Sequence, residues 1–379
     1  MPSMSDPRTV LREAHRIVVK VGSSSITAPQ GGIDRYRLQA LSTVIARRWL
    51  DGDQVVLVSS GAIAAGMTPL GLTRRPKDLA TQQAAASAGQ GSLLAAYAQA
   101  FGLHGLHVGQ VLLTADDMHR RSHYVNASRT LEKLLELEIV PVVNENDTVA
   151  TEEIRFGDND RLAALVAHLV DADALVLLTD VDALYDGHPR KPGSQRVPLV
   201  RSHEEIAGID ITLPGSHVGS GGMVTKVAAA QMATAEGIPV LLTSADQAAQ
   251  ALSGDDVGTF FLPTGSKRPA RRRWLAHASN VNGRLILDQG AVEAVVRRQT
   301  SLLPVGVTRV EGTFRAGDTV DLCDPSGEVV ARGLVGYDSA ELVRLVGRRL
   351  DADRRTEARP RNARNGPRTV IRRDDLVVL

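Results

Sequence analysis

Short apolar runs alternate with longer amphipathic stretches from the N-terminus to residue 262. The runs are rich in Val, Ile and Leu, and each ends in Gly, Ser, Thr, Asn or Asp. Runs of this kind are typical of strands that are buried on both faces of a parallel sheet. They predict strands over residues 16–21, 54–59, 107–114, 139–144, 174–179 and 239–243.

The stretches between these runs are rich in alanine or carry apolar residues at helical spacing. They predict helices over residues 36–50, 79–101, 125–137, 160–169 and 226–236. Strands that alternate with helices predict an α/β fold, with an open and mostly parallel sheet sandwiched by helices. Because ligands of such sheets bind beyond the carboxyl ends of the strands, the polar residues that follow each strand are the first candidates for a site.

The pattern changes after residue 262, so we expect residues 1–262 to form one domain. Residues 263–273 are basic, contain two prolines and are typical of a linker. Short apolar runs separated by glycine-containing turns then predict a small, mostly β domain over residues 274–379. Within it, residues 348–368 are rich in arginine and poor in apolar side chains, which favours a solvated or disordered segment.

Composition and charge exclude several classes of protein. The 44 basic and 43 acidic residues give a net charge of +1, which excludes a basic field over the whole protein for nucleic acid or membrane. The single cysteine, Cys323, excludes an intrachain disulfide and a CxxC metal site. No apolar run reaches the ~18 residues of a transmembrane helix, and residues 1–15 lack the apolar core of a secretory signal. We therefore expect a cytoplasmic protein with no membrane contact.

Two glycine-rich segments combine small residues with a lysine. The first predicted strand holds Lys20 and runs into Gly22 and Ser23, and the string GSGGMVTK at residues 219–226 leads into a helix at Lys226. Small residues let backbone N–H groups approach a phosphate, and a lysine adds positive charge. Neither segment has Walker A spacing. A solvent-directed lysine and a flexible linker are the structural alternatives.

Two further strand ends carry small polar residues. Ser60 and Gly61 open the Gly/Ala-rich start of a helix, where free N–H groups can bind an anion. Thr179 and Asp180 end a fully apolar strand, where a nucleotide base or ribose could be held. A tight turn and a polar strand end are the respective structural alternatives.

Amide and carboxylate side chains gather after the strand predicted at residues 139–144. Asn144 and Asp147 belong to the string NEND, and Asn159 and Asp160 belong to the string GDND. Amides can bind both the ammonium and the carboxylate of an amino acid, whereas carboxylates alone would suggest a metal or an acid/base pair. Helix capping explains one such residue but not two clusters. Together with two lysines, the clusters predict phosphoryl transfer, which needs positioning and positive charge.

The order and spacing of these strings resemble the amino acid kinase family, and within it the glutamate 5-kinases. The resemblance covers essentially the whole chain, and the pair NEND and GDND separates this branch from acetylglutamate, aspartate and uridylate kinases. Residues 274–379 resemble the PUA domain. The kinase strings are VVKVGSS at 18–24, SSGAIAAG at 59–66, VNENDTVAT at 143–151, FGDND at 156–160, LLTDVDALY at 177–185 and GSGGMVTK at 219–226.

The resemblance implies the ATP-dependent phosphorylation of the γ-carboxylate of L-glutamate to L-glutamyl 5-phosphate, the first step of proline biosynthesis, with Mg²⁺ carried by ATP and no metal site on the protein. By position, it implies that Lys20, Lys226 and Asp160 are catalytic, with Asp160 orienting the two lysines. The implied glutamate-binding residues are Ser60, Gly61, Asn144, Asp147 and Asn159. The implied ATP-binding residues are Lys20, Gly22, Ser23, Thr179, Asp180, Ser220, Gly221, Gly222, Met223, Val224, Thr225 and Lys226.

The resemblance also implies feedback inhibition by proline and a homo-oligomer, either a dimer or a tetramer. Two alternatives stay open. One is another kinase that forms an acyl phosphate, such as an acetylglutamate kinase, although Asp147 and Asn144 suit the free ammonium of glutamate. The other is RNA binding through the PUA-like domain and its arginines. The net charge of +1 and the 3% of aromatic residues argue against RNA binding.

Overall fold

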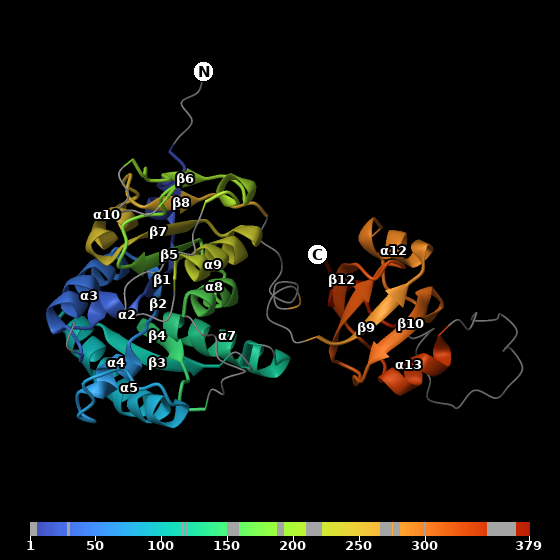
Figure 1. The fold of residues 1–379 in the computed structure, drawn as a ribbon, viewed down its shortest axis with the longest axis horizontal. Coiled ribbons are helices and arrows are strands. Elements are labelled where there is room, and N and C mark those ends of the chain that lie inside the picture. Colours follow the sequence, from blue (N-terminus) through green and yellow to red (C-terminus); the bar gives the residue numbers. More distant parts are fainter. Residues whose placement is uncertain are drawn as a thin grey trace, which may run out of the picture. The chain divides into compact units, whose positions relative to one another are not determined.

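The computed structural model divides the chain into two compact units (Figure 1). The first lies within residues 1–268, and the bulk of the second is residues 269–379. The predicted linker beyond residue 265 and the arginine-rich residues 348–368 lie outside the described residues. The structure describes residues 6–28, 31–114, 117–118, 120–149, 159–187, 193–209, 222–265, 275, 281–298, 300–346 and 369–379.

An eight-stranded sheet forms the centre of the first unit, and the predicted open, mostly parallel sheet is confirmed. Only β8 and β6 run against the other strands, since β8 is antiparallel to β7 and β6 is parallel to β8. These two strands, of three and two residues, are too short to give a sequence period, and the sequence did not predict them. The order across the sheet is β3 (His107–Leu113), β4 (Ile139–Glu145), β2 (Gln54–Val58), β1 (Arg16–Val21), β5 (Ala174–Thr179), β7 (Val240–Ser244), β8 (Thr259–Phe261) and β6 (Leu199–Val200).

Helices cover both faces of this sheet, as Figure 1 shows for α3 and α8. The main core packs α3, α5 and α10 against one face, where Ile17, Val19 and Val21 of β1 are fully buried. Successive side chains of a strand alternate between its faces, so Lys20 is directed to the face of α8 and α9. The helices are α1 (Thr9–Glu13), α2 (Ser23–Ile26), α3 (Arg35–Leu50), α4 (Ala62–Met67), α5 (Leu79–Gly102), α7 (Arg121–Glu136), α8 (Asn159–Leu169), α9 (Met223–Ala235) and α10 (Ala248–Ser253).

No helix in the described part of the chain is long and apolar enough to cross a membrane. The five long helices occur where the sequence predicts them, with ends that differ by a few residues. The largest difference is at α7, which begins at Arg121 rather than at residue 125. α9 begins at Met223, ahead of the predicted residue 226, because Gly222 is its N-cap.

Two glycines bring α4 and α5 into close contact. A Cβ atom on Gly66 would lie 1.8 Å from the Ala85 carbonyl oxygen, and one on Gly89 would lie 1.8 Å from the Ala62 carbonyl oxygen. Only glycine allows two helix backbones to approach so closely. The start of α4, which follows Ser60 and Gly61, is therefore fixed against α5.

The second unit is a small, mostly β domain, as predicted. Its sheet has the strand order β10 (Val307–Gly312), β9 (Val281–Leu287), β11 (Thr319–Cys323), β12 (Val329–Leu334) and β13 (Leu376–Val378). The helices α12 (Gln289–Val296) and α13 (Ser339–Leu345) accompany it. The last strand pairs antiparallel with β12, and the thiol of Cys323 is buried in β11. Burial raises the pKa of this thiol.

Replacing Gly89 by alanine is expected to destabilise the first unit by about 3 kcal/mol, because the new methyl group meets the Ala62 backbone. Chemical unfolding of the purified protein measures the change. Gly91→Ala is the matched control on the same helix, since a Cβ atom there has no neighbour within 4 Å. This control is expected to be neutral or to stabilise the protein by about 0.5–1 kcal/mol. Equal effects of the two substitutions would contradict the close contact.

Candidate active site

Four neighbouring parallel strands end at one edge of the large sheet. Lys20 of β1 is level with Val58 of β2 and with Leu177 of β5. Val58 is in turn level with Val143 of β4. The chain passes from β1 to β2 on one side and places β5 on the other, so β1 lies at a topological switch point, where ligands of α/β sheets bind.

A buried aspartate holds two lysines at this edge. Asp160, in the first turn of α8, is fully buried and pairs with Lys20 of β1 through Oδ1. Its Oδ2 atom lies 3.1 Å from Nζ of Lys226, on α9. The lysine side chains are 4% and 8% exposed. Two positive charges and one negative charge give this cluster a net charge of +1.

The cluster is connected to the glycine loop before α9. The Thr225 hydroxyl lies 2.8 Å from the Gly222 carbonyl oxygen and 3.3 Å from Oδ2 of Asp160. Buried ammonium groups near a helix N-terminus attract a phosphate and can neutralise charge on a phosphoryl group during its transfer. The structure therefore brings together the three residues that the sequence predicts to be catalytic, Lys20, Lys226 and Asp160.

The amide of Asn159 organises the neighbouring part of the edge. Its Nδ2 atom lies 2.9 Å from the Ser59 carbonyl oxygen, 3.0 Å from the Ser60 hydroxyl and 2.9 Å from Oδ1 of Asn144, and these three acceptors share its two hydrogens. Oδ1 of Asn144 also accepts from the backbone N–H of Glu145 at 2.9 Å. These bonds fix the orientation of both amides, since each uses one end of its side chain for protein contacts.

The opposite ends of the two amides remain for a ligand. Nδ2 of Asn144 and Oδ1 of Asn159 are buried and form no hydrogen bond with any other described residue. Buried polar groups are normally paired, so a donor and an acceptor left together indicate a ligand that carries both kinds of group. An amino acid does. Asp147 lies nearby in the turn after β4, where it is partly buried.

The other predicted residues that the structure describes lie at strand ends and helix starts of the same unit. Gly22 follows β1 and donates from its N–H to the Leu178 carbonyl oxygen at 3.1 Å, and Ser23 begins α2. Thr179 ends β5, and its hydroxyl donates to Asp180 at 2.9 Å. Gly61 caps α4 with φ +96°. Gly222 caps α9, which begins with Met223 and Val224. Ser220 and Gly221 lie outside the described residues.

The sequence did not predict a role for Tyr97 on α5, which lies behind this edge. Its hydroxyl oxygen is 3.0 Å from Oγ of Ser59, and both residues are fully buried. Burial raises the pKa of Tyr97, and the bond to Ser59 only partly opposes that rise. The one signal in the sequence is an aromatic pair, Tyr97 and Phe101, at helical spacing in an alanine-rich stretch.

Among the residues that the structure describes, no group of three or more His, Cys, Asp or Glu side chains is placed to hold a metal ion. A histidine near the end of β3 has a carboxylate partner instead, with Nδ1 of His123 2.8 Å from Oδ1 of Asp117. Burial raises the pKa of Asp117, but hydrogen bonds with His123 and Thr114 outweigh this effect and hold the pKa below its ordinary value.

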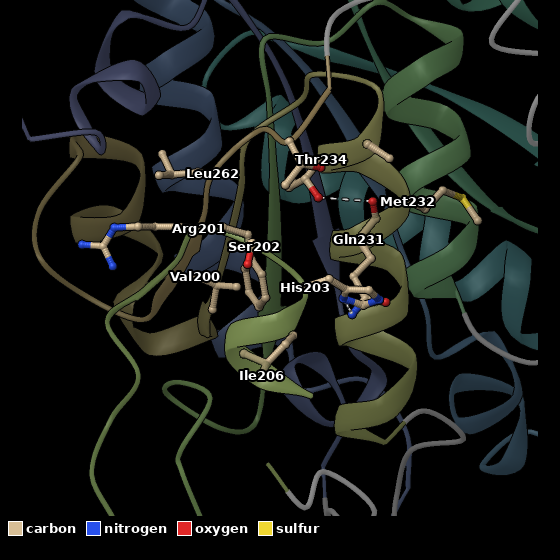
Figure 2. A pocket seen from close by; sticks show the side chains of 12 residues that line it. Val200, Arg201, Ser202, His203, Ile206, Gln231, Met232, Thr234 and Leu262 are labelled. Atoms are coloured by element: carbon tan, nitrogen blue, oxygen red, sulfur yellow. Dashed lines mark hydrogen bonds between the residues drawn. The ribbon is translucent and has the colours of Figure 1, made fainter. Parts of the chain in front are cut away.

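A separate pocket of about 350 Å³ lies against the C-terminal half of α9, and Figure 2 shows its lining. The 3₁₀ helix Glu204–Ile206 forms one wall, and His203 contacts Gln231 across it. The Thr234 hydroxyl donates to the Gln231 carbonyl oxygen at 3.2 Å. None of the predicted site residues lines this pocket, and most of its lining is apolar.

The chain is similar to known proteins over most of its length. The model of the amino acid kinase family matches residues 15–244, and that of the PUA domain matches residues 283–355. The glutamate 5-kinase of Thermobifida fusca is 58% identical over 98% of this chain and 95% of its own length. That of Salinispora arenicola is 60% identical over 97% of this chain and 98% of its own length. Among solved structures, the Giardia lamblia carbamate kinase bound to AMP-PNP has a TM-score of 0.47 and 18% identity, over 65% of this chain and 97% of its own.

Replacing Asp160 by asparagine is expected to lower the free energy of unfolding by about 3 kcal/mol, because two buried ammonium groups then lose the carboxylate that both pair with. The double variant Asp160→Asn/Lys226→Met is expected to recover part of the loss, since it buries one charge fewer. Urea unfolding at pH 7 measures both. Glu132→Gln, which breaks a half-exposed ion pair with Arg16, is the control and is expected to cost at most about 1 kcal/mol. An Asp160→Asn protein as stable as the wild type would contradict the role of this carboxylate.

Proposed function

The chain belongs to the amino acid kinase family, and on this basis we propose that it transfers the γ-phosphoryl group of ATP to the γ-carboxylate of L-glutamate. The products are L-glutamyl 5-phosphate and ADP, and the reaction is the first step of proline biosynthesis. The observation that carries the proposal is the pair formed by Lys20 and Lys226 around Asp160, beside the amides of Asn144 and Asn159.

The chemistry requires charge compensation rather than acid/base catalysis. A glutamate carboxylate has a pKa near ~4.3 in solution and is ionised at neutral pH, so it can attack without losing a proton. One carboxylate oxygen forms a bond to the γ-phosphorus, the bond to the bridging oxygen breaks, and its electron pair leaves with ADP. Nucleophile and triphosphate are both negative. Lys20 and Lys226 reduce their repulsion and stabilise charge on the moving group.

The amide cluster supports free glutamate as the acceptor. In our proposal, Oδ1 of Asn159 and the carboxylate of Asp147 accept from the α-ammonium group, while Nδ2 of Asn144 and the Ser60 hydroxyl donate to carboxylate oxygens. An N-acetylated substrate has no ammonium group for the carboxylate of Asp147 to bind. The chemistry of this cluster therefore favours glutamate over N-acetylglutamate.

The nucleotide belongs on the other side of the lysines, in our proposal. Thr179 and Asp180 follow β5 on that side of β1, and the N–H groups at the start of α9 supply donors for phosphate. Mg²⁺ enters on ATP, because Asp160 already pairs with two lysines. Proline as a feedback inhibitor, a homo-oligomer and a cytoplasmic location complete the proposal, and the resemblance to glutamate 5-kinases supports all three.

Hydroxylamine trapping tests the reaction directly, because hydroxylamine converts an acyl phosphate into a coloured hydroxamate. We expect purified protein with Mg-ATP to give hydroxamate from L-glutamate, and none from N-acetylglutamate or aspartate. Lys20→Ala and Lys226→Ala are each expected to lower kcat by about 100-fold or more. Hydroxamate from N-acetylglutamate alone would show that glutamate is not the substrate. Unchanged kcat in both lysine variants would overturn the proposed role of Lys20 and Lys226.

Replacing Asp147 by asparagine is expected to raise KM for glutamate by about tenfold or more, because a charged hydrogen bond to the ammonium group is lost. KM for ATP is expected to stay unchanged, since Asp147 follows β4 on the side away from β5. Steady-state kinetics with each substrate varied in turn measure both constants. Equal increases in KM for glutamate and for ATP would contradict the proposal that Asp147 binds glutamate.

A further inference from the structure

A short turn carries Ser60 from β2 to α4, and contacts on the side of the site hold it in place. The amide of Asn159 donates to the Ser59 carbonyl oxygen and to the Ser60 hydroxyl. Gly61 completes the turn at φ +96°, a left-handed conformation that glycine adopts without strain. The position of Ser60 also depends on the contacts that this turn makes on its other side, towards α5.

Two buried hydroxyl groups fix the turn from behind. The Ser59 hydroxyl lies 3.0 Å from the hydroxyl of Tyr97 and 3.2 Å from the Ser60 carbonyl oxygen, to which it donates. A serine hydroxyl has a single proton. The distance between Tyr97 and Ser59 suits a hydrogen bond in either direction, and when the Ser59 proton goes to the Ser60 carbonyl the donor is Tyr97. A chain of donors thus runs from Tyr97 through Ser59 to the backbone of Ser60.

Tyr97 is a rigid starting point for this chain. It belongs to the main core, where its ring centroid lies 6.4 Å from that of Phe101. Its helix, α5, is fixed against α4 by the approach of Gly66 and Gly89. Burial also raises the pKa of Tyr97, so the phenol keeps its proton at neutral pH and remains a donor.

We propose that Tyr97 is a positioning residue for the glutamate side of the active site. It acts through Ser59, by fixing the peptide group that follows Ser59 and hence the place of the Ser60 hydroxyl. The inference rests on the proposed function, in which Ser60 contacts glutamate. Because β5 and α9 form the nucleotide side, loss of the Tyr97 hydroxyl should affect glutamate and not ATP.

Tyr97→Phe removes the hydroxyl and keeps the ring. We expect KM for glutamate to rise about three- to tenfold, the effect of one lost hydrogen bond, and KM for ATP to stay unchanged. Ser59→Ala is expected to act in the same direction. The double variant should raise KM for glutamate by less than the product of the two single effects, because both substitutions remove the same hydrogen bond. Steady-state kinetics of the full-length protein, each at a saturating level of the other substrate, measure these constants.

Two matched controls remove a buried hydroxyl elsewhere and should leave both KM values unchanged. They are Tyr337→Phe in the second unit and Ser42→Ala on α3. An unchanged KM for glutamate in Tyr97→Phe, or an equal rise for ATP, overturns the proposal. If Tyr97→Phe does not fold, Ser59→Ala decides by the same criterion. If the wild-type protein phosphorylates no glutamate, the proposed function itself is overturned. The wild-type assay therefore distinguishes an error in the proposed function from an error in the role of Tyr97.

Discussion

The buried carboxylate of Asp160 is the interaction on which the rest of the site depends. Two lysines that are less than a tenth exposed carry a large desolvation cost, and the fully buried carboxylate of Asp160, which pairs with both, offsets part of that cost. Because the three groups come from β1, α8 and α9, the same contact holds the sheet and two helices in register. Stability and charge placement therefore depend on one side chain.

Asn159, the residue before Asp160, fixes the side of the site where we propose that glutamate binds. Asn159 and Asp160 are consecutive at the start of α8, where successive side chains point about 100° apart around the helix axis. Asn159 is directed to the ends of β2 and β4, and Asp160 to β1 and α9. In the proposed function, one helix start thus sets both the place of the acceptor and the charges around the phosphoryl group, so a single element fixes the distance between them.

Much of the fold could be predicted from the sequence, because buried parallel strands appear as apolar runs. β1 and β5 have the predicted ends, whereas β6, with two residues, is too short to show a pattern. For the site, the strings of small and polar residues predicted which strand ends matter. The resemblance implies that Asp160 orients the two lysines, but the residue pattern alone does not predict this contact, since it depends on how α8 and α9 pack. Tyr97 was missed because its role depends on a contact with Ser59, 38 positions earlier in the chain.

The charge balance explains why a kinase would keep an anion between its two cations. Two lysines without Asp160 would offer a charge of +2 to the phosphates, and the observed cluster offers only +1. Without that anion, however, the two ammonium groups would repel each other and turn towards water. A fixed donor stabilises a transition state better than a mobile one, because it needs no reorganisation as charge develops. A smaller positive charge in a fixed place is therefore of more use to the reaction than a larger charge that moves. Backbone N–H groups and the ion that ATP carries must balance the rest of the negative charge of ATP.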